Sequence, residues 1–427
     1  MTMKMATFER LEEQTKQYKK TRCRYCDSPL PESFLDLGFS PLANNLPKAE
    51  EKDVEEFQCP LRLVHCQVCH LVQLSHVVPP DMMFAHYLYV SSTTKTFQTH
   101  FAEYAKTAVS KLKSKQNALA VDIGSNDGLL VSFFIKEGIK GVGVEPAKNL
   151  AELSVRNGVP TINSYFGRET VQMITKEYGK ASIVTANNVF AHIDDVQSVL
   201  RNVNDLLPDN GIFIIEFPYL MTMFEKMYFD MIYHEHLSYI GITALDYFTK
   251  RFGLQIFDIQ PISSHGGSLR VFIQKTGGGR EISETVTDYL KNESAHGISN
   301  EKNYREFSVK VANIKTEIMK MVREIKANGK SIAGYGAPAK ATTIANYCGL
   351  TKEHIDYVVD DNSLKQGRLV PGCRIPIVSS AHLTEHPTDC ILIFAWNFAE
   401  EIVKKMDPSI KAGKQFIVPL PKPKIIL

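Results

Sequence analysis

A buried strand that runs into a glycine turn is the feature that most constrains the fold of this chain. Residues 119–130 have the sequence LAVDIGSNDGLL, and a second apolar run, VGV, ends at Glu145. The first run ends at Asp122 and is typical of a buried parallel strand. Gly124 and Gly128 allow the backbone to turn tightly and to approach a ligand at the start of a helix. The pattern predicts a nucleoside-binding βαβ unit.

The acidic residues around this turn indicate which nucleoside it binds. Glu145, seventeen residues after Gly128, can accept hydrogen bonds from both ribose hydroxyls of an adenosine. A dinucleotide fingerprint has three glycines that approach a pyrophosphate, whereas this turn has fewer glycines and more acids. It favours a cationic ligand without phosphate, S-adenosylmethionine (SAM); the alternative is a turn that joins strand and helix with no ligand. The expected SAM-binding residues here are Asp122, Gly124, Ser125, Asn126, Gly128 and Glu145.

The length and composition bound the number of domains and the class of protein. A chain of 427 residues with 44% hydrophobic residues is expected to form two to four domains with more than one core. The net charge of +2 gives no electrostatic footprint for a nucleic acid. The polar start of the chain and the absence of an apolar run of roughly 20 residues predict a cytoplasmic protein with no membrane partner.

Strand and helix patterns alternate along most of the chain. After an expected helix over 96–112, strands are expected at 119–122, 140–144, 181–185 and 211–217, with a helix over 194–207. After Phe252 the pattern restarts with strands at 254–259 and 269–274 and a long helix over 303–328, followed by strands at 331–334, 355–359, 390–395 and 415–418. The expected fold is α/β: an N-terminal zinc-binding module (1–85), a Rossmann-like SAM-binding domain (86–251) and a C-terminal Rossmann-like domain (252–427).

Two Cys-x-x-Cys pairs predict the metal site of the first module. Cys23 and Cys26 form one pair, and Cys66 and Cys69 the other. Four thiolates close a tetrahedral zinc site and leave no position for water, so the zinc is expected to organise the fold and not to catalyse. The rival ligands are Cys59, His65 and His70, and a redox pair would need a strand-helix setting that is absent here.

The segment Tyr233-His-Glu-His-Leu-Ser-Tyr239 is the expected catalytic loop. It follows an expected strand at the edge where an open α/β sheet places its crevice. Its histidines are two residues apart and do not favour a shared metal. His236 is expected to remove a proton from carbon beside a carbonyl, Glu235 to orient the imidazole or share the proton, and Tyr233 to hydrogen-bond the enolate. A solvated or structural loop is the alternative.

Two further loops are expected to contribute ligand-binding side chains. Asn187 and Asn188 are expected at the amino-acid moiety of SAM and His192 towards substrate, although an asparagine also caps helices. The turn Gly334-Tyr-Gly-Ala-Pro-Ala-Lys340 puts Pro338 near a helix start whose free N–H groups, with Lys340, can hold a diphosphate. A tight strand-to-helix connection is the alternative. Arg270 and Lys365 are further candidates for anionic contacts, with solvated surface charge as the alternative.

Several motifs in the same order make the chain resemble the zinc-containing nucleotide-sugar C-methyltransferases, such as the C-3 methyltransferase of the tetronitrose pathway. The match covers nearly the whole chain. The shared motifs are the two cysteine pairs with Leu71-Val-Gln-Leu74, Asp-Ile-Gly-Ser-Asn-Asp-Gly128, Tyr233 to Tyr239, His265-Gly-Gly-Ser-Leu-Arg270, Gly334 to Lys340, and Asp360-Asp-Asn-Ser-Leu-Lys-Gln-Gly367.

The resemblance implies that a 4-keto-deoxysugar carried on a nucleoside diphosphate is methylated at C-3. It implies that His236 is the base, supported by Glu235 and Tyr233, and that Tyr87 and His192 face the substrate. It further implies that the third domain helps to hold the nucleotide-sugar, with Arg270, Tyr335, Ala337, Lys340 and Lys365 as candidate contacts.

The chain departs from the family at two points. Both leave the expected reaction class unchanged and bear on which sugar is the substrate. Ser363 stands where the family has proline, and the segment Tyr89 to Lys95 lacks the family's glycine. An O- or N-methyltransferase of another small molecule, and a zinc-knuckle nucleic-acid-binding or scaffold protein with a relict methyltransferase fold, are the alternatives. The oligomeric state is left open, and a monomer is compatible with the sequence.

Overall fold

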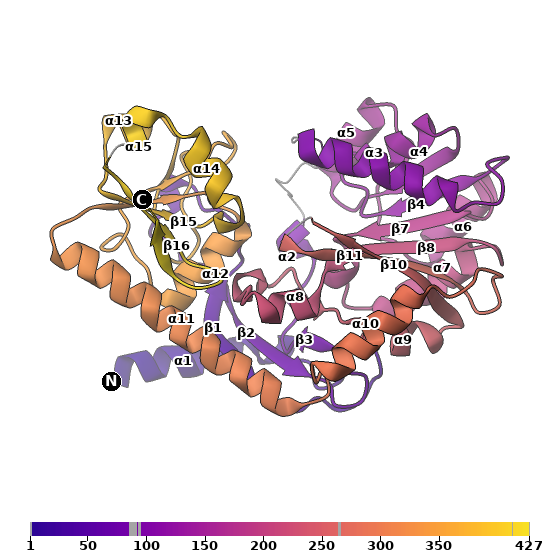
Figure 1. Cartoon of the computed structure of the whole chain (residues 1–427), viewed down its shortest axis with the longest axis horizontal. Helices are drawn as coiled ribbons and strands as arrows, with labels where there is room; N and C mark the ends of the chain where they lie inside the picture. Colours follow the sequence, from indigo (N-terminus) through magenta and orange to yellow (C-terminus); the bar gives the residue numbers. More distant parts are fainter. Residues whose placement is uncertain (1, 85–91, 93–94, 264–265, 412, 427) are drawn as a thin grey trace.

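A computed structural model describes residues 2–84, 92, 95–263, 266–411 and 413–426. Its strands form three sheets of four, seven and six strands. The seven-stranded and six-stranded sheets form two α/β domains at opposite ends of the molecule, and the four-stranded sheet lies between them (Figure 1). The predicted α/β class is confirmed.

The four-stranded antiparallel sheet belongs to the zinc module, but its last strand comes from the catalytic loop. The module contributes β1 (Leu35–Pro41), β2 (Gln58–His65) and β3 (Val72–Leu74), with helices α1 (Thr2–Thr15) and α2 (Asp81–Phe84) at its ends. The fourth strand, β9 (Ser238–Tyr239), pairs with β3. The end of the Tyr233–Tyr239 segment is therefore fixed to the zinc module.

The seven-stranded sheet has the order β10-β11-β8-β7-β4-β5-β6. Its five parallel strands are β4 (Leu119–Ile123), β5 (Lys140–Val144), β6 (Thr161–Ile162), β7 (Ile183–Asn187) and β8 (Ile212–Pro218). Every residue of β4 is buried, as expected for a parallel strand covered on both faces. The strand order reverses between β4 and β7, and an open α/β sheet binds ligands at the carboxyl ends of strands at such a point.

Helices cover both faces of this sheet. Apolar side chains of α3 (Lys95–Ser110) and α4 (Leu129–Lys136) join one buried cluster, whereas those of α6 (Arg168–Glu177), α7 (Val196–Leu206) and α9 (Ile242–Lys250) join another. Helix α5 (Lys148–Arg156) follows β5. The predicted helix over 194–207 is α7, which begins after Asp195 because the Asp195 carboxylate accepts a hydrogen bond from the Ser198 N–H at 3.0 Å.

The central sheet continues beyond the predicted domain boundary at residue 251. Strands β10 (Leu254–Ile262) and β11 (Ser268–Lys275) form a hairpin that pairs with β8. We expected both strands in the C-terminal domain because the strand pattern restarts after Phe252, but their edge-to-edge pairing with β8 places them in the central sheet. Helix α10 (Glu284–Ala295) packs against β10.

The C-terminal domain is a second, mostly parallel sheet with the order β14-β13-β12-β15-β16-β17. Its strands are β12 (Ile332–Tyr335), β13 (Val358–Val359), β14 (Ile377–Val378), β15 (Cys390–Ile393), β16 (Gln415–Val418) and the antiparallel β17 (Lys424–Ile426). Its helices are α12 (Ala339–Cys348), α13 (His382–Glu385), α14 (Ala399–Lys405) and α15 (Pro408–Lys411). The predicted Rossmann-like architecture of this domain is confirmed.

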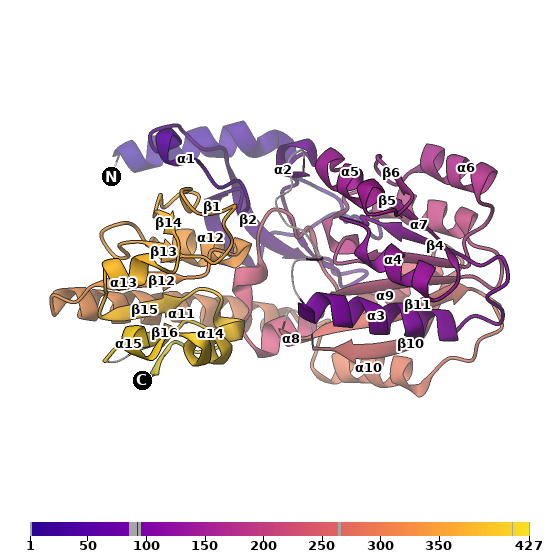
Figure 2. The ribbon, with the colours of Figure 1, turned by 90° about the horizontal axis from the view of Figure 1, so that it is seen from above.

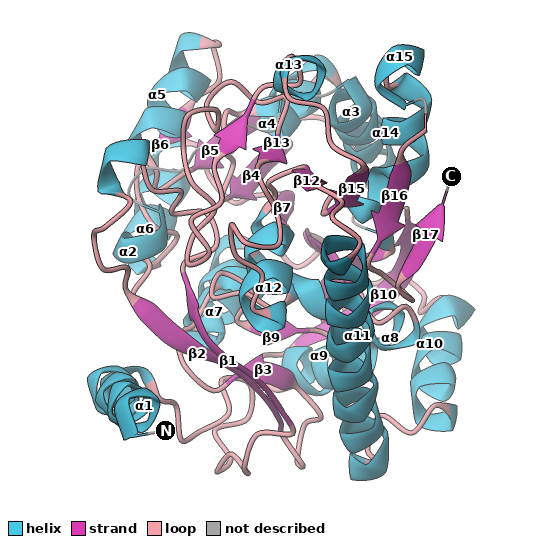
Figure 3. Ribbon diagram, turned by 90° about the vertical axis from the view of Figure 1, so that its left-hand side faces the viewer, coloured by secondary structure: helices cyan, strands magenta, loops and turns pink. Residues whose placement is uncertain are grey.

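The long helix α11 (Glu301–Ala327) connects the two α/β domains. It runs from the side of the central domain to the C-terminal domain and passes beside the zinc-module sheet (Figures 1 and 3). Helix α1 lies along the outer side of the molecule. In Figure 2 the N and C marks both lie at the left-hand side of the molecule. In the described part of the chain, no helix combines the length and apolar character that a membrane crossing needs.

Candidate active site and zinc centre

The four cysteines predicted as zinc ligands lie together. Their sulfur atoms are all within 4.8 Å of one another. The Cys23 and Cys69 Sγ atoms are 3.5 Å apart, and those of Cys26 and Cys66 are 3.4 Å apart. A tetrahedral zinc with Zn–S distances of about 2.3 Å separates its sulfurs by roughly 3.8 Å, so the four side chains fit this ion with little adjustment.

The rival ligands lie outside this cluster. The thiol of Cys59 is buried away from the four sulfurs, and burial raises its pKa to about 12. His65 and His70 face each other, with Nε2 of the first 3.3 Å from Nδ1 of the second, and the His65 ring stacks on Tyr304 at 4.1 Å between ring centres. A four-cysteine site is therefore the arrangement that the geometry favours.

Asp122 and Thr185 meet where the central strand order reverses. The Thr185 hydroxyl donates a hydrogen bond of 2.5 Å to the Asp122 carboxyl group. Burial raises the pKa of Asp122 to about 7, and the nearby charge of Glu145 adds to the rise. Asp122 is 5% exposed, so its carboxyl group is buried between β4 and β7.

The two glycines of the turn are required by neighbouring protein groups. Gly124 and Gly128 have φ of +67° and +80°, values that favour glycine. A Cβ atom on Gly124 would lie 2.5 Å from a methyl group of Val189, and one on Gly128 would lie 2.2 Å from the Ser154 hydroxyl. Both glycines thus permit the tight turn that we expect from the sequence, and they also permit its close packing against Val189 and Ser154.

Glu145 fixes the turn from the end of the neighbouring strand. One carboxylate oxygen accepts the Asn126 N–H and the other accepts the Ala147 N–H, both at 2.8 Å. Burial raises the pKa of Glu145. Each oxygen has a second lone pair, so the carboxylate can still accept a ribose hydroxyl.

Among the residues that the structure describes, several buried polar atoms around the turn have no hydrogen-bond partner. They are Ser125 Oγ, Asp127 Oδ1 and Asn188 Oδ1. Buried polar atoms are normally paired, and groups left unpaired point to a missing ligand or water. The positions fit a polar nucleoside ligand such as SAM, with Asp122, Ser125, Asn126 and Glu145 around it.

The loop after β7 meets the catalytic loop. β7 ends at Asn187, and His192 ends the short helix η4 (Phe190–His192) that follows. The Leu237 N–H donates a hydrogen bond of 2.9 Å to the Ala191 carbonyl. The rings of His192 and His236 are 5.0 Å apart between centres, and burial lowers the pKa of His192 to about 4.

Two hydrogen bonds orient the imidazole of His236. Its Nδ1 lies 2.8 Å from the Met231 carbonyl, and its Nε2 lies 2.8 Å from the Tyr233 hydroxyl. A carbonyl can only accept, so Nδ1 carries the proton, and in the neutral ring Nε2 is the acceptor for the Tyr233 O–H. The acceptor nitrogen of His236 is thus held next to a phenol, close to His192 of the loop after β7.

Glu235 is held by a residue of the zinc module. Its side chain is buried, and one carboxylate oxygen accepts a hydrogen bond of 2.6 Å from the Asn44 amide. The neighbouring His234 is also buried, and its Nε2 donates to the Cys59 carbonyl at 2.9 Å. Burial lowers the pKa of His234 to about 4, which is consistent with a neutral structural imidazole.

The first zinc knuckle contacts the backbone that follows His236. Arg24, between the two cysteines of the knuckle, is buried and donates to the Leu237 carbonyl and to the Ser238 hydroxyl. Gln73 of β3 accepts from the Arg24 N–H at 3.3 Å and donates to Cys23 Sγ at 3.2 Å. The zinc ligands and the catalytic loop therefore share one hydrogen-bonded network.

Arg270 is paired inside the central domain. Its guanidinium donates to one oxygen of Glu216 at 3.0 and 3.1 Å, and His100 lies 2.8 Å from the other oxygen. It also lies 3.9 Å above the Tyr104 ring. Its side chain is 5% exposed, so the geometry gives this arginine a structural ion pair where we had predicted an anion contact.

The predicted residues of the C-terminal domain gather at the carboxyl edge of its sheet. The Tyr335 hydroxyl donates to Asp361 at 3.0 Å, and the Ala337 N–H donates to Asp360 at 2.7 Å. Lys365 donates to the Ala337 carbonyl at 2.8 Å. This lysine is therefore bonded within the turn, whereas we had expected it at an anion.

Lys340 lies in the first turn of α12, beside the segment that leads into the catalytic loop. Its ammonium is 5.0 Å from the centre of the Trp396 ring. The Trp396 indole N–H donates to the buried Asp230 at 2.5 Å, and Asp230 belongs to the short helix η5 (Phe229–Met231). The Thr343 hydroxyl of α12 donates to the Ile232 carbonyl at 2.9 Å.

The order of domains matches known methyltransferases along the whole chain. Family models match residues 23–84 (zinc binding domain), 97–259 (methyltransferase domain) and 263–421 (C-methyltransferase C-terminal domain). The C-methyltransferase NovU of Streptomyces niveus is 36% identical over 404 residues, which cover 95% of this chain and 96% of that protein. The chain belongs to the zinc-containing C-methyltransferase family.

Two other similarities each cover less than half of the chain. A ubiquinone biosynthesis O-methyltransferase of Coxiella burnetii is 22% identical over 156 residues, 34% of this chain and 67% of that protein. The crystal structure of a magnesium protoporphyrin IX methyltransferase from Synechocystis with bound SAM has 11% identity and a TM-score of 0.31, and covers 42% of this chain and 79% of that one. The family models and the relative that spans 95% of this chain, not these two partial similarities, show that the protein is a SAM-dependent C-methyltransferase with a small-molecule substrate.

Asn44 and Arg24 were missed by sequence reasoning. A buried arginine inside a metal knuckle is a weak signal that the knuckle has a partner, but no pattern marks Asn44, which lies 191 positions from Glu235. Tyr87, predicted to face the substrate, lies outside the described residues, as does His265 of the resemblance motif.

Proposed function

We propose that this C-methyltransferase methylates C-3 of a 4-keto-deoxysugar carried on a nucleoside diphosphate. The observation that carries the proposal is the oriented pair of Tyr233 and His236 at the edge of the donor site. O- and N-methyl transfer act on atoms that already hold a lone pair, whereas carbon must first lose a proton. An enzyme that alkylates carbon therefore needs a base such as this one.

The proposed reaction has two steps. Nε2 of His236, with its hydrogen bond from Tyr233 released, takes the proton from the carbon beside the ketone, and the resulting enolate is stabilised by the Tyr233 hydroxyl. In the second step the enolate carbon would take the sulfonium methyl group that SAM supplies when bound: the C–C bond would form as the S–CH3 bond breaks, and S-adenosylhomocysteine would leave with the electron pair of that bond. The Met231 carbonyl keeps the ring in place and stabilises the imidazolium, because the Nδ1–H bond of 2.8 Å persists when Nε2 is protonated.

The C-terminal domain supports the nucleotide half of the proposal. The first turn of α12 offers free N–H groups and the Lys340 ammonium, a combination that favours a diphosphate. Tyr335 and Ala337 lie on the turn before this helix, with Asp360 and Asp361 bonded to them. Of the predicted cationic contacts, Lys340 is the one that we retain, since Arg270 and Lys365 are bonded to protein acceptors.

The test is a methylation assay across thymidine-, guanosine- and cytidine-diphospho-4-keto-deoxysugars, with the product identified by NMR. We expect one new C–CH3 group at C-3. Incubation in D2O without SAM is expected to exchange the C-3 proton in the wild-type enzyme and not in His236→Ala. A product with the methyl group on oxygen or nitrogen, and no exchange, would reject the proposal.

A further inference from the structure

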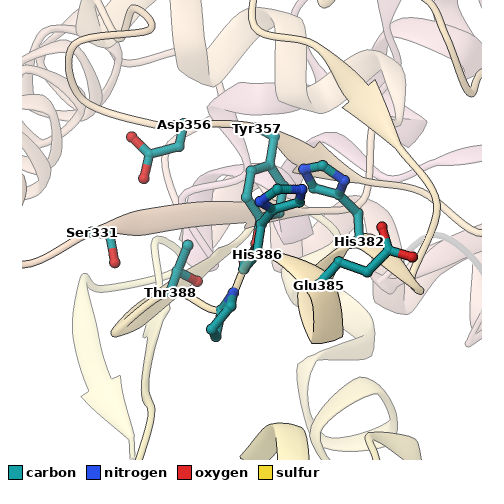
Figure 4. Close-up of a pocket in the computed structure, with 8 residues that line it drawn as sticks. Ser331, Asp356, Tyr357, His382, Glu385, His386 and Thr388 are labelled. Carbon is teal, nitrogen blue, oxygen red and sulfur yellow. Dashed lines mark hydrogen bonds between the residues drawn. The ribbon is translucent and has the colours of Figure 1, made fainter.

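Three potential metal ligands gather in the C-terminal domain outside the methyl-transfer site. His382 and Glu385 belong to α13, and His386 follows directly. Their ligand atoms lie within 4.8 Å of one another. Together with Asp356 they line an open cavity of about 470 Å3 (Figure 4).

The cavity lies at the amino edge of the six-stranded sheet. Ser331, Asp356 and Thr388, which line it, each precede a strand: β12, β13 and β15 respectively. The turn from Gly334 to Lys340 lies at the carboxyl edge of the same sheet. The cluster is therefore on the opposite edge from the expected nucleotide contacts and lies outside the proposed methyl-transfer site.

Tyr357 contacts the His382 ring and the backbone of His386. His382 and His386 are four residues apart, a spacing that places side chains on the same side of a helical turn. Their ring centres are 4.2 Å apart. The Tyr357 ring packs edge-on against His382 at 4.6 Å, and its hydroxyl donates to the His386 carbonyl. In Figure 4 the two rings lie side by side, and Glu385 extends on the side of His382.

The kind of donors selects the class of metal. Two imidazoles and one carboxylate suit zinc and the neighbouring divalent transition metals, which accept such ligands at about 2.0–2.2 Å and fill the remaining position with water. Calcium and magnesium favour sites built from oxygen ligands, and the cluster has a single carboxylate. A small change in side-chain rotamers brings three atoms within 4.8 Å onto one ion.

We propose that His382, Glu385 and His386 form a second metal site, for a divalent transition-metal ion, in addition to the four-cysteine zinc centre. The ion links the single-turn helix α13 to the segment that enters β15. An isolated helix of one turn is unstable by itself, so a bound ion stabilises this corner of the domain. The open coordination position is occupied by water.

Metal titration of the full-length enzyme with its four-cysteine zinc in place tests the proposal. We expect one additional equivalent of Co2+ or Zn2+ by calorimetry, and slower amide exchange over residues 381–389 when it binds. Cobalt in this site gives no thiolate-to-metal charge-transfer band, which separates it from cobalt that has replaced zinc at Cys23, Cys26, Cys66 and Cys69.

The variants His382→Ala and His386→Ala are expected to weaken binding of the additional ion by more than roughly tenfold, since even an outer-shell partner contributes 10–100-fold. Methyl transfer and the four-cysteine zinc are expected to stay unchanged. Glu385→Gln is the milder variant should either alanine variant unfold. His354→Ala is the matched control, because His354 is in the same domain and bonds Thr351. Wild-type enzyme without a saturable additional equivalent, or variants that bind it like wild type, would overturn the proposal.

Discussion

The side-chain amide of Asn44 donates a hydrogen bond of 2.6 Å to the carboxylate of Glu235. Asn44 follows β1 in the zinc module, and Glu235 lies between His234 and the expected base, His236. Glu235 is 4% exposed, and a buried carboxylate depends on such donors because it has lost its contact with water. We therefore predict that the zinc module contributes a positioning side chain, Asn44, to the proposed active site.

Replacement of Asn44 by Ala is expected to lower kcat by roughly 10–100-fold, because loss of a hydrogen bond to a buried charged group costs about 1.5–3 kcal/mol. SAM affinity is expected to stay within about twofold, since Asn44 is not among the donor-site residues. Steady-state kinetics and SAM calorimetry measure the two effects. Asn45→Ala, an exposed neighbour, is the control, and an unchanged kcat in Asn44→Ala would rule out the positioning role.

Removal of the Tyr233 hydroxyl tests the oriented imidazole. Tyr233→Phe deletes the donor that lies 2.8 Å from His236 Nε2. We expect kcat to fall by roughly 10²–10⁴, the usual contribution of acid-base groups, while His236→Ala abolishes methyl transfer and both variants keep their SAM affinity. Tyr247→Phe, on the exposed side of α9, controls for the loss of a phenol. A fully active His236→Ala enzyme would refute the base.

Zinc removal is expected to inactivate the enzyme although the metal takes no part in the chemistry. Gln73 connects Cys23 to Arg24, and Arg24 holds the backbone just after His236. Cys23→Ser should lose zinc, lower the melting temperature and reduce kcat. Metal analysis, thermal unfolding and kinetics of the same preparation give the three readouts. Cys373→Ser, outside the cluster, should retain all three, and a zinc-free enzyme with normal kcat would contradict the coupling.

Local patterns were sufficient to predict most of the fold. β4 and α11 were found within two residues at each end, because burial of β4 on both faces and the apolar stripe of α11 leave strong periodic signals. The four cysteines were found because thiolate spacing reports metal chemistry directly. Each of these features depends on residues that are neighbours in the sequence or repeat at fixed spacing.

Features that depend on distant partners were not predicted. The local sequence of β10 fits an edge strand of the central sheet as well as the first strand of the next domain. Its place is decided by long-range pairing, because β10 pairs with β11 and β11 pairs with β8. Arg270 was expected at an anion because its partner, Glu216, is 54 residues away. Asn44 had no signal at all, because its role exists only once β9 joins the zinc-module sheet.

Asp122 is expected to make the stability of the enzyme without SAM depend on pH. Burial raises its pKa to about 7, whereas an unfolded aspartate titrates near 3.9. Between about pH 4 and pH 7 the folded protein therefore keeps a proton that the unfolded chain has lost. This carboxyl group makes the free energy of unfolding fall as pH rises through that window, and its contribution becomes constant above the window.

Asp122→Asn removes this ionisation and keeps an oxygen that can accept the Thr185 hydroxyl. The difference in unfolding free energy between the variant and wild type is expected to increase by on the order of 2 kcal/mol from pH 5 to pH 8, in favour of the variant. One pKa unit corresponds to about 1.4 kcal/mol. Urea unfolding at both pH values measures the difference. Asp209→Asn, at a fully exposed aspartate, should show none. If the variant instead exceeds wild type by the same amount at pH 5 and at pH 8, Asp122 is already ionised at pH 5 in the folded wild-type enzyme. The polar groups between β4 and β7 would then stabilise the charged carboxylate.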